Sequence, residues 1–139
     1  MRRHRDEGND HTAEDVTYST NPPTSGPHDP QWAPDGVHDQ SPDLEQSVHA
    51  LEHGRINIQY DPELASDQVP QLEALVAEEV KGQPGYHTLL FANQTQMPYE
   101  IAATAWRRSL TCPRFTPEVF DALRTFRAAY VDKGPELVP

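Results

Sequence analysis

The sequence has little cysteine, few basic residues and no long apolar run. Its single cysteine, Cys112, has no second cysteine with which to form an internal disulfide. Eleven Lys and Arg residues stand against 22 Asp and Glu residues, which gives a formal net charge of -11 at pH 7. Nucleic acids and anionic membrane surfaces repel a chain this acidic, so we expect neither as a partner, whereas cations are attracted.

No apolar stretch is long enough to span a bilayer, so we expect no membrane insertion by this chain. The first ten residues, MRRHRDEGND, are polar and charged, and no apolar segment of the kind that a signal peptide needs follows them. We interpret residues 1–10 as a disordered tail. The remaining residues, 11–139, have a length that suits a single small domain.

Hydrophobic periodicity and the positions of Pro and Gly predict the order of helices and strands. Strands are expected at 15–20, 55–60, 86–92 and 100–106, helices at 41–54, 66–82 and 116–130, and a Pro-rich loop at 21–42. The order strand–helix–strand–helix–strand–strand–helix predicts an α+β domain with a small mixed sheet. It is also the element order of a thioredoxin-like core, although the chain contains no C-x-x-C motif.

The predicted helix at 41–54 ends in the string VHALEHG. His49, Glu52 and His53 are spaced i, i+3 and i+4, which places their side chains on one face of a helix. Two imidazoles one turn apart can bind the same metal ion. The string H-x-x-E-H is also a zinc-hydrolase pattern in which the Glu is the general base. As a structural alternative, the histidines interact with the C-terminal end of the helix dipole and Glu52 pairs with Arg55.

A second histidine-bearing segment, NPPTSGPHDP at 21–30, encloses His28 among four prolines. Proline fixes φ and lacks an N–H group, so the segment is a stiff loop. Stiffness lowers the entropy that is lost when a ligand side chain is ordered. We therefore predict that His28, His49 and His53 bind one metal ion, with His11 as a candidate fourth ligand. A surface turn with an incidental histidine is the alternative for His28.

The identity of the metal depends on the other ligands. Imidazole sites suit copper and zinc alike, whereas a thioether favours copper. Met97, in the predicted turn between the last two strands, is a candidate soft ligand, so we expect copper or zinc, with copper preferred. The alternative for Met97 is a residue that fills a gap under a loop. His4, His38 and His87 lie in the tail, the loop and the start of a strand, and we do not assign them to the site.

Five features, spread over nearly the whole chain after residue 10, belong together. They are His11, PPTSGPH at 22–28, HALEHG at 49–54, TAW at 104–106 and GPELVP at 134–139. In these features the chain resembles a bacterial family catalogued as domain of unknown function 3105. The family name implies no function. Members often look like extracytoplasmic domains behind one membrane segment, so the resemblance implies an extracytoplasmic location.

The sequence therefore predicts a histidine-rich domain that binds a transition metal and acts as a binding, carrier or sensor module. One alternative is a zinc-dependent hydrolase with Glu52 as its base. That alternative is weakened because the predicted helix is short and no second helix offers a distant acidic ligand. The other alternative is a domain without metal, in which hydrogen bonds tie the histidines together. The sequence defines no substrate and no protein partner.

Overall fold

The strand β3, Ile56–Tyr60, lies in the middle of a mixed sheet of six strands. The structure is a computed structural model that describes residues 1–139. Neighbouring strands follow the order β1-β8-β7-β3-β6-β2. The other strands of this sheet are β1 (Arg2–Arg3), β2 (Gly36–Val37), β6 (Thr88–Ala92), β7 (Ile101–Ala105) and β8 (Arg108–Cys112). The sheet is mixed because β3 pairs in parallel with β6 and antiparallel with β7.

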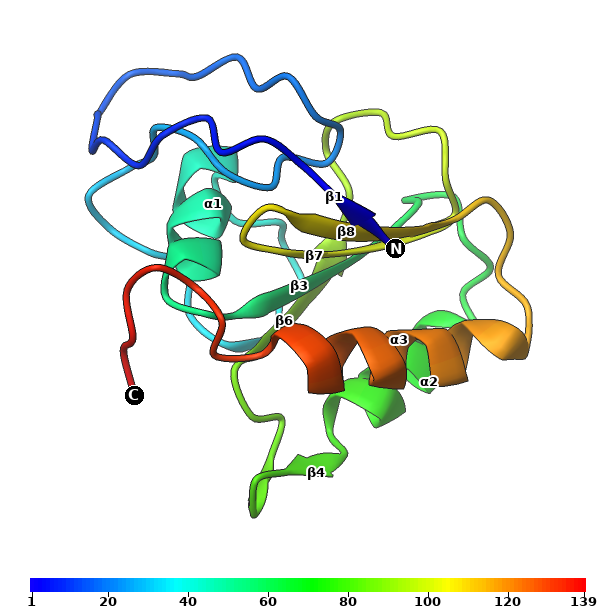
Figure 1. Cartoon of the computed structure of the whole chain (residues 1–139). Coiled ribbons are helices and arrows are strands. Elements are labelled where there is room, and N and C mark those ends of the chain that lie inside the picture. Colours follow the sequence, from blue (N-terminus) through cyan, green and yellow to red (C-terminus); the bar gives the residue numbers. More distant parts are fainter.

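Helices cover both faces of the sheet (Figure 1). The helix α1, Leu44–Glu52, lies on one face, whereas α2, Val69–Val76, and α3, Glu118–Tyr130, lie on the other. The central strands are therefore buried on both sides, which explains why β6 and β7 are runs of apolar residues rather than alternating ones. None of the three helices combines the length and the apolar character that crossing a membrane requires.

Alternate residues of the central strands pack into two different cores. Ile56 and Ile58 of β3 belong to a cluster of 14 buried side chains with α2 and α3. Leu89 and Phe91 of β6 pack with α1 on the opposite face. Because successive side chains of a strand point to opposite faces, this period of two fixes the register of both strands. Asn57 faces α1 and donates a hydrogen bond to its backbone at 3.0 Å, which ties the helix to the sheet.

The prediction of a small α+β domain with a mixed sheet is confirmed. All three predicted helices and the predicted strands at 55–60, 86–92 and 100–106 are present. The second helix ends at Val76 rather than at residue 82. After it, β4 (Glu79–Val80) and β5 (Gln83–Pro84) form a separate antiparallel pair.

The prediction of a strand at 15–20 is wrong, because these residues form no strand. The N–H group of Val16 donates to Glu45 Oε2 at 3.0 Å, and the hydroxyl group of Tyr18 donates to the carbonyl of Pro27 at 2.6 Å. This segment is therefore held by hydrogen bonds to a side chain of α1 and to the Pro-rich loop, and not by backbone hydrogen bonds to a neighbouring strand. The expected thioredoxin-like order depended on this strand, and the observed order of long elements begins with α1 instead.

Three strands of the sheet come from segments that the sequence did not predict. β2 pairs with β6, and β1 pairs with β8, so residues 1–10 contribute an edge strand where we expected a disordered tail. β8 follows β7 after a turn at Trp106 and Arg107, which lacks the Gly or Asn typical of short hairpins. Arg107 adopts the positive φ of 64° that such a turn requires. The sequence of this turn therefore gave no indication that a second strand of a hairpin follows.

Asp132, just after α3, joins three parts of the fold. Its carboxylate accepts hydrogen bonds from Lys81, Tyr86 and His87 at 2.7, 2.6 and 2.7 Å. Its N–H group donates to the carbonyl of Gly54 at 2.8 Å. Burial alone would raise the pKa of Asp132, but the three donors outweigh burial and lower this pKa to about 2. His87 thus has a structural place next to Asp132.

Replacement of Asp132 by Asn tests this network. A carboxyl group whose pKa falls from 3.8 in the unfolded chain to about 2 in the folded protein stabilises the fold above pH 3.8. That contribution is lost as the pH falls toward 2. We expect Asp132→Asn to lower the free energy of unfolding near neutral pH by about 1 kcal/mol, a value reduced to allow for the exposed Lys81.

Urea unfolding near neutral pH and near pH 2 measures the effect, and the deficit should shrink at the lower pH. Asp121→Asn is the control, because that carboxylate is 91% exposed and should matter little at either pH. A deficit of the same size at both pH values would show that the ionised carboxylate is not what stabilises the fold.

Candidate metal centre

The C-terminal end of α1 carries three buried polar side chains on one face: those of His49 and Glu52 in the helix and that of His53 at its C-cap. Their i, i+3 and i+4 spacing produces this arrangement. The helix ends here because Gly54 follows with a φ of 82°, the left-handed conformation typical of helix C-termini. Buried polar groups need partners, so the segments that pack against this face decide what the three side chains can do.

The middle of the Pro-rich loop, residues 22–28, packs inside the molecule. Thr24, Ser25 and His28 are fully buried. The N–H group of Arg107 donates to the carbonyl of Thr24 at 2.8 Å, and the Ser25 hydroxyl group accepts a hydrogen bond from the N-terminal backbone at 2.9 Å. His28 is therefore no incidental residue of a surface turn, because the loop holds it in the interior.

Gly26 fixes the orientation of the His28 ring. The ring nitrogen Nδ1 of His28 lies 2.9 Å from the carbonyl oxygen of Gly26. Gly26 has a φ of 124°, and a Cβ at this position would lie 2.9 Å from the ring of Tyr18. Only glycine fits both conditions. The Tyr18 hydroxyl group, whose pKa burial raises, stays protonated and donates to the neighbouring carbonyl of Pro27.

His11 reaches the same place through a short parallel bridge with His28. The N–H group of Thr12 donates to the His28 carbonyl at 2.7 Å, and the N–H group of His28 donates to the Asp10 carbonyl at 2.9 Å. The two imidazole rings lie 5.0 Å apart between centroids. Because the side chain of His11 is 49% exposed, it forms the side of the cluster that faces solvent.

One donor atom from each of four side chains lies within 4.8 Å of the other three: those of His11, His28, His49 and Glu52. Glu52 Oε1 is 3.2 Å from His28 Nε2 and 3.8 Å from His49 Nε2. It is 4.0 Å from His11 Nε2. A tetrahedral ion with ligands at about 2.0–2.1 Å separates its ligand atoms by about 3.4 Å. The four atoms therefore fit one ion after small side-chain movements.

Hydrogen bonds define the neutral tautomer of two of these rings. His28 Nδ1 faces the carbonyl of Gly26, and His49 Nδ1 faces the carbonyl of Asp29 at 2.7 Å. Because a carbonyl only accepts, each Nδ1 carries a proton, and each neutral ring has a lone pair at Nε2. The Glu52 carboxylate next to His28 Nε2 also only accepts when ionised. These two acceptors, 3.2 Å apart, need a cation between them, either a proton or a metal ion.

His53 borders this group without joining it. Its Nε2 lies 3.0 Å from His49 Nε2 and 3.9 Å from Glu136 Oε1. Burial, and then the proximity of His49, lowers the pKa of His53 to about 4. Burial also lowers the pKa of His49, although the carbonyl of Asp29 opposes this. Both rings are therefore neutral at neutral pH, the form that binds metals. Glu52, His53 and Glu136 form a second group of potential ligands.

Two tryptophans enclose the histidines. Trp106 packs edge-on against His28 with 6.2 Å between ring centroids. Trp32 lies over His49 and His53 at 5.6 and 5.1 Å, and it is itself 53% exposed. Apolar surroundings strengthen electrostatic interactions between a charge and its ligands. The cluster is thus covered by aromatic rings and open to solvent beside His11.

The C-terminal segment returns to the end of α1. The N–H group of Glu136 donates to the carbonyl of Glu52 at 3.0 Å. A Cβ at Gly134 would overlap this carbonyl oxygen and the nitrogen of Gly54, so the two backbones meet in direct contact. The string GPELVP therefore packs against the string HALEHG, and it places the carboxylate of Glu136 near His53.

Of the residues that the sequence assigns to the site, the structure brings together His11, His28, His49 and Glu52, with His53 at the edge. It does not bring Met97 to this cluster. Met97 lies before β7, in a hollow next to Asp61, whereas Trp106 follows the opposite end of that strand. At about 3.4 Å per residue, the two ends of β7 are about 14 Å apart.

The remaining histidines have partners elsewhere: His4 with Ser109, His38 with the carbonyl of Pro34 and His87 with Asp132. Sequence reasoning missed Trp32 and Glu136. For Glu136 a signal existed, since it lies within the shared string GPELVP. For Trp32 there was none, because its position over the histidines depends on how the loop folds.

Fold and site define a class of protein, a small α+β domain with a buried cluster of imidazoles around one carboxylate. A family model, protein of unknown function (DUF3105), matches residues 10–138. The chain belongs to this family, as its shared strings suggested. No curated protein and no solved structure matches the chain.

Gly134→Ala tests the contact between the C-terminal segment and α1. The added Cβ must push the segment away from the carbonyl of Glu52, so we expect a loss of roughly 1–3 kcal/mol in the free energy of unfolding. Denaturant unfolding measures the loss. Leu137→Ala is the control, because this side chain is 75% exposed and its removal should be nearly neutral. If both variants were as stable as the unmodified protein, the C-terminal segment would not pack as described.

Proposed function

We propose that this domain binds one divalent transition-metal ion through His11, His28, His49 and Glu52. One observation supports the proposal most strongly. In the interior, two acceptors face each other: the lone pair of His28 Nε2 and the carboxylate of Glu52. A metal ion would satisfy both acceptors and would also bind the lone pair of His49. Binding to His49 Nε2 would replace the hydrogen bond that this atom accepts from His53 Nε2 at 3.0 Å. The ion would in addition give a partner to His11, whose Nε2 lies 4.0 Å from Glu52 Oε1.

The donor set suits zinc and divalent copper alike, since three imidazoles and a carboxylate are ligands for both. The reason for preferring copper was a thioether from Met97. Because Met97 lies beyond the other end of β7, that reason no longer applies. The proposal is therefore a divalent ion, zinc or copper, held by three nitrogens and one oxygen.

A binding, carrier or sensor role agrees better with this geometry than hydrolysis does. A catalytic zinc site keeps a position open for water, whereas four protein ligands fill a tetrahedral ion. Glu52 is directed at the imidazole nitrogens, which is the place of a ligand and not of a base beside a bound water molecule. The exposed ring of His11 offers a ligand that can release and recapture the ion.

Metal retention tests the proposal. Untagged protein loaded with zinc or copper and then dialysed should retain about one equivalent of metal by elemental analysis. A His28→Ala/His49→Ala variant should retain almost none. His38→Ala is the matched control, because this histidine lies outside the cluster and pairs with the carbonyl of Pro34. Equal retention by the double variant and the control would refute the proposal.

Glu52→Gln separates metal binding from a purely structural network. An amide N–H group can donate to His28 Nε2, so in a metal site the substitution should leave the metal-free protein at least as stable and weaken metal binding by about tenfold or more. In a metal-free network, Glu52 would instead pair with a protonated His28, and the substitution would remove that ion pair.

Thermal unfolding in the presence of a chelator, together with calorimetric titration of zinc, gives both readouts. A marked drop in the stability of the metal-free variant, with no change in metal retention, would favour the structural network over the proposal.

A further inference from the structure

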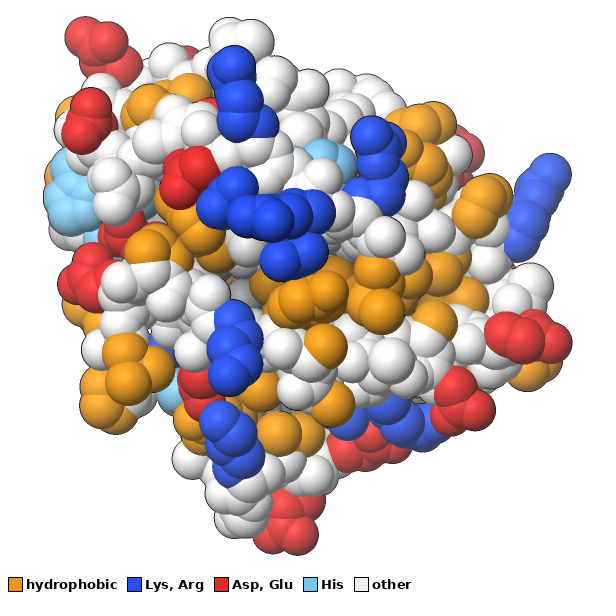
Figure 2. All heavy atoms as spheres, viewed as in Figure 1, with side chains coloured by type: hydrophobic (Ala, Val, Ile, Leu, Met, Phe, Trp, Pro, Cys, Tyr) orange, Lys and Arg blue, Asp and Glu red, His pale blue; other side chains and the backbone are white.

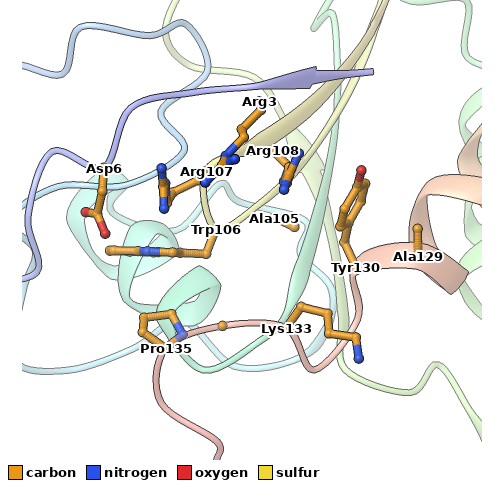
Figure 3. Close-up of a pocket in the computed structure, with 11 residues that line it drawn as sticks. Arg3, Asp6, Ala105, Trp106, Arg107, Arg108, Ala129, Tyr130, Lys133 and Pro135 are labelled. Atoms are coloured by element: carbon orange, nitrogen blue, oxygen red, sulfur yellow. The ribbon is translucent and has the colours of Figure 1, made fainter.

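A second candidate site lies beside Trp106, the residue that also packs edge-on against His28. The turn between β7 and β8, the strand β1 and the end of α3 enclose a hollow of about 450 Å³. Figure 3 shows its lining: the ring of Trp106 lies flat in the hollow, with Arg3, Arg107 and Arg108 on one side of it and Pro135 on the other. The ring of Tyr130 stands beside Arg108.

The charge of this hollow is opposite to the charge of the chain. Four of the eleven Lys and Arg side chains form ion pairs with carboxylates: those of Arg55, Lys81, Arg124 and Arg127. Seven do not, and four of these seven line the hollow, namely Arg3, Arg107, Arg108 and Lys133. Figure 2 shows Lys and Arg side chains across the middle of this face, while most acidic side chains in view lie toward its edge.

Gathering unpaired cations costs free energy, because like charges repel one another. The chain has 22 acidic residues with which it could neutralise them, yet only Asp6 lines the hollow, and it forms no ion pair there. Two of the arginines are nevertheless held in place. Arg107 Nε donates to the carbonyl of His4 at 3.2 Å, and the guanidinium group of Arg108 lies 5.2 Å from the ring centroid of Tyr130.

These contacts leave the terminal N–H groups of both guanidinium ions free for another acceptor. Guanidinium forks bind phosphate and carboxylate groups through paired hydrogen bonds. The aromatic rings of Trp106 and Tyr130 and the neighbouring Pro135 supply an apolar wall for the rest of a ligand. A volume of about 450 Å³ lies in the range of small-molecule sites.

We propose that this hollow binds a small organic anion. Its phosphate or carboxylate group pairs with Arg3, Arg107 and Arg108, and a flat apolar part packs against Trp106 and Tyr130. The proposal does not depend on the metal site, because none of these residues belongs to the histidine cluster. Trp106 contacts both places, since it lines the hollow and packs edge-on against His28.

Calorimetric titration of the full chain with phenyl phosphate tests the proposal, at low salt and with a chelator present. Phenyl phosphate should bind more tightly than inorganic phosphate, because only the former has a ring for the apolar wall. Benzoate in a parallel titration distinguishes a carboxylate from a phosphate group. Arg108→Gln and, separately, Arg3→Gln should each weaken binding by about tenfold, the equivalent of one charge-assisted hydrogen bond.

Arg3 is exposed on an edge strand, so its substitution tests the site even if Arg108→Gln disturbs the fold. Arg114→Gln is the matched control, since Arg114 forms no ion pair and lies outside the hollow. Equal weakening by the control variant would overturn the proposal, as would equal affinities for phenyl phosphate and inorganic phosphate. Binding of a glutamate-rich peptide without binding of either aromatic anion would also overturn it, and would identify a protein-docking surface instead.

Discussion

The buried carboxylate of Glu52 imposes the strongest constraint on this structure. An ionised carboxylate in the interior loses the solvation of water, and it is stable there only with cationic or donor partners. When the ring is neutral, its nearest neighbour, His28 Nε2, offers a lone pair, because the ring proton lies on Nδ1 and is donated to the carbonyl of Gly26. The arrangement is therefore short of one positive charge. A proton can supply that charge, and a metal ion can supply it while engaging two further imidazoles.

Much of the rest of the chain serves to bring these groups together. Three segments far apart in the sequence surround the end of α1: the segment with His11, the buried loop 22–28 and the C-terminal string at 134–139. Each is held by backbone hydrogen bonds and not by a large apolar core. Irregular segments of this kind lose conformational entropy when they are ordered, and glycines at close contacts make the packing specific. Trp106 packs against His28 of the cluster and also lines the hollow that contains Arg3, Arg107 and Arg108.

The sequence predicted what depends on local patterns. The period of 3.6 residues placed His49, Glu52 and His53 on one helix face, and the apolar runs gave the central strands. It did not predict β1, β2 or the position of Met97, because these depend on long-range pairing. It also did not predict β8, because the turn before this strand lacks Gly and Asn. The sequence also did not lead to the proposed role of Glu52 as a ligand, because it offered Glu52 as the base of a hydrolase or as a partner of Arg55. That choice needs the direction of the ring nitrogens, which only the contacts with Gly26 and Asp29 define.

Crystals of the metal-loaded protein, measured with anomalous scattering at the absorption edge of the metal, test the central claim most directly. The account predicts one strong anomalous peak at about 2.0–2.2 Å from the Nε2 atoms of His11, His28 and His49 and from a carboxylate oxygen of Glu52. A structure in which this position holds no ion, with His28 paired directly to Glu52 and the metal found only at surface residues, would contradict it.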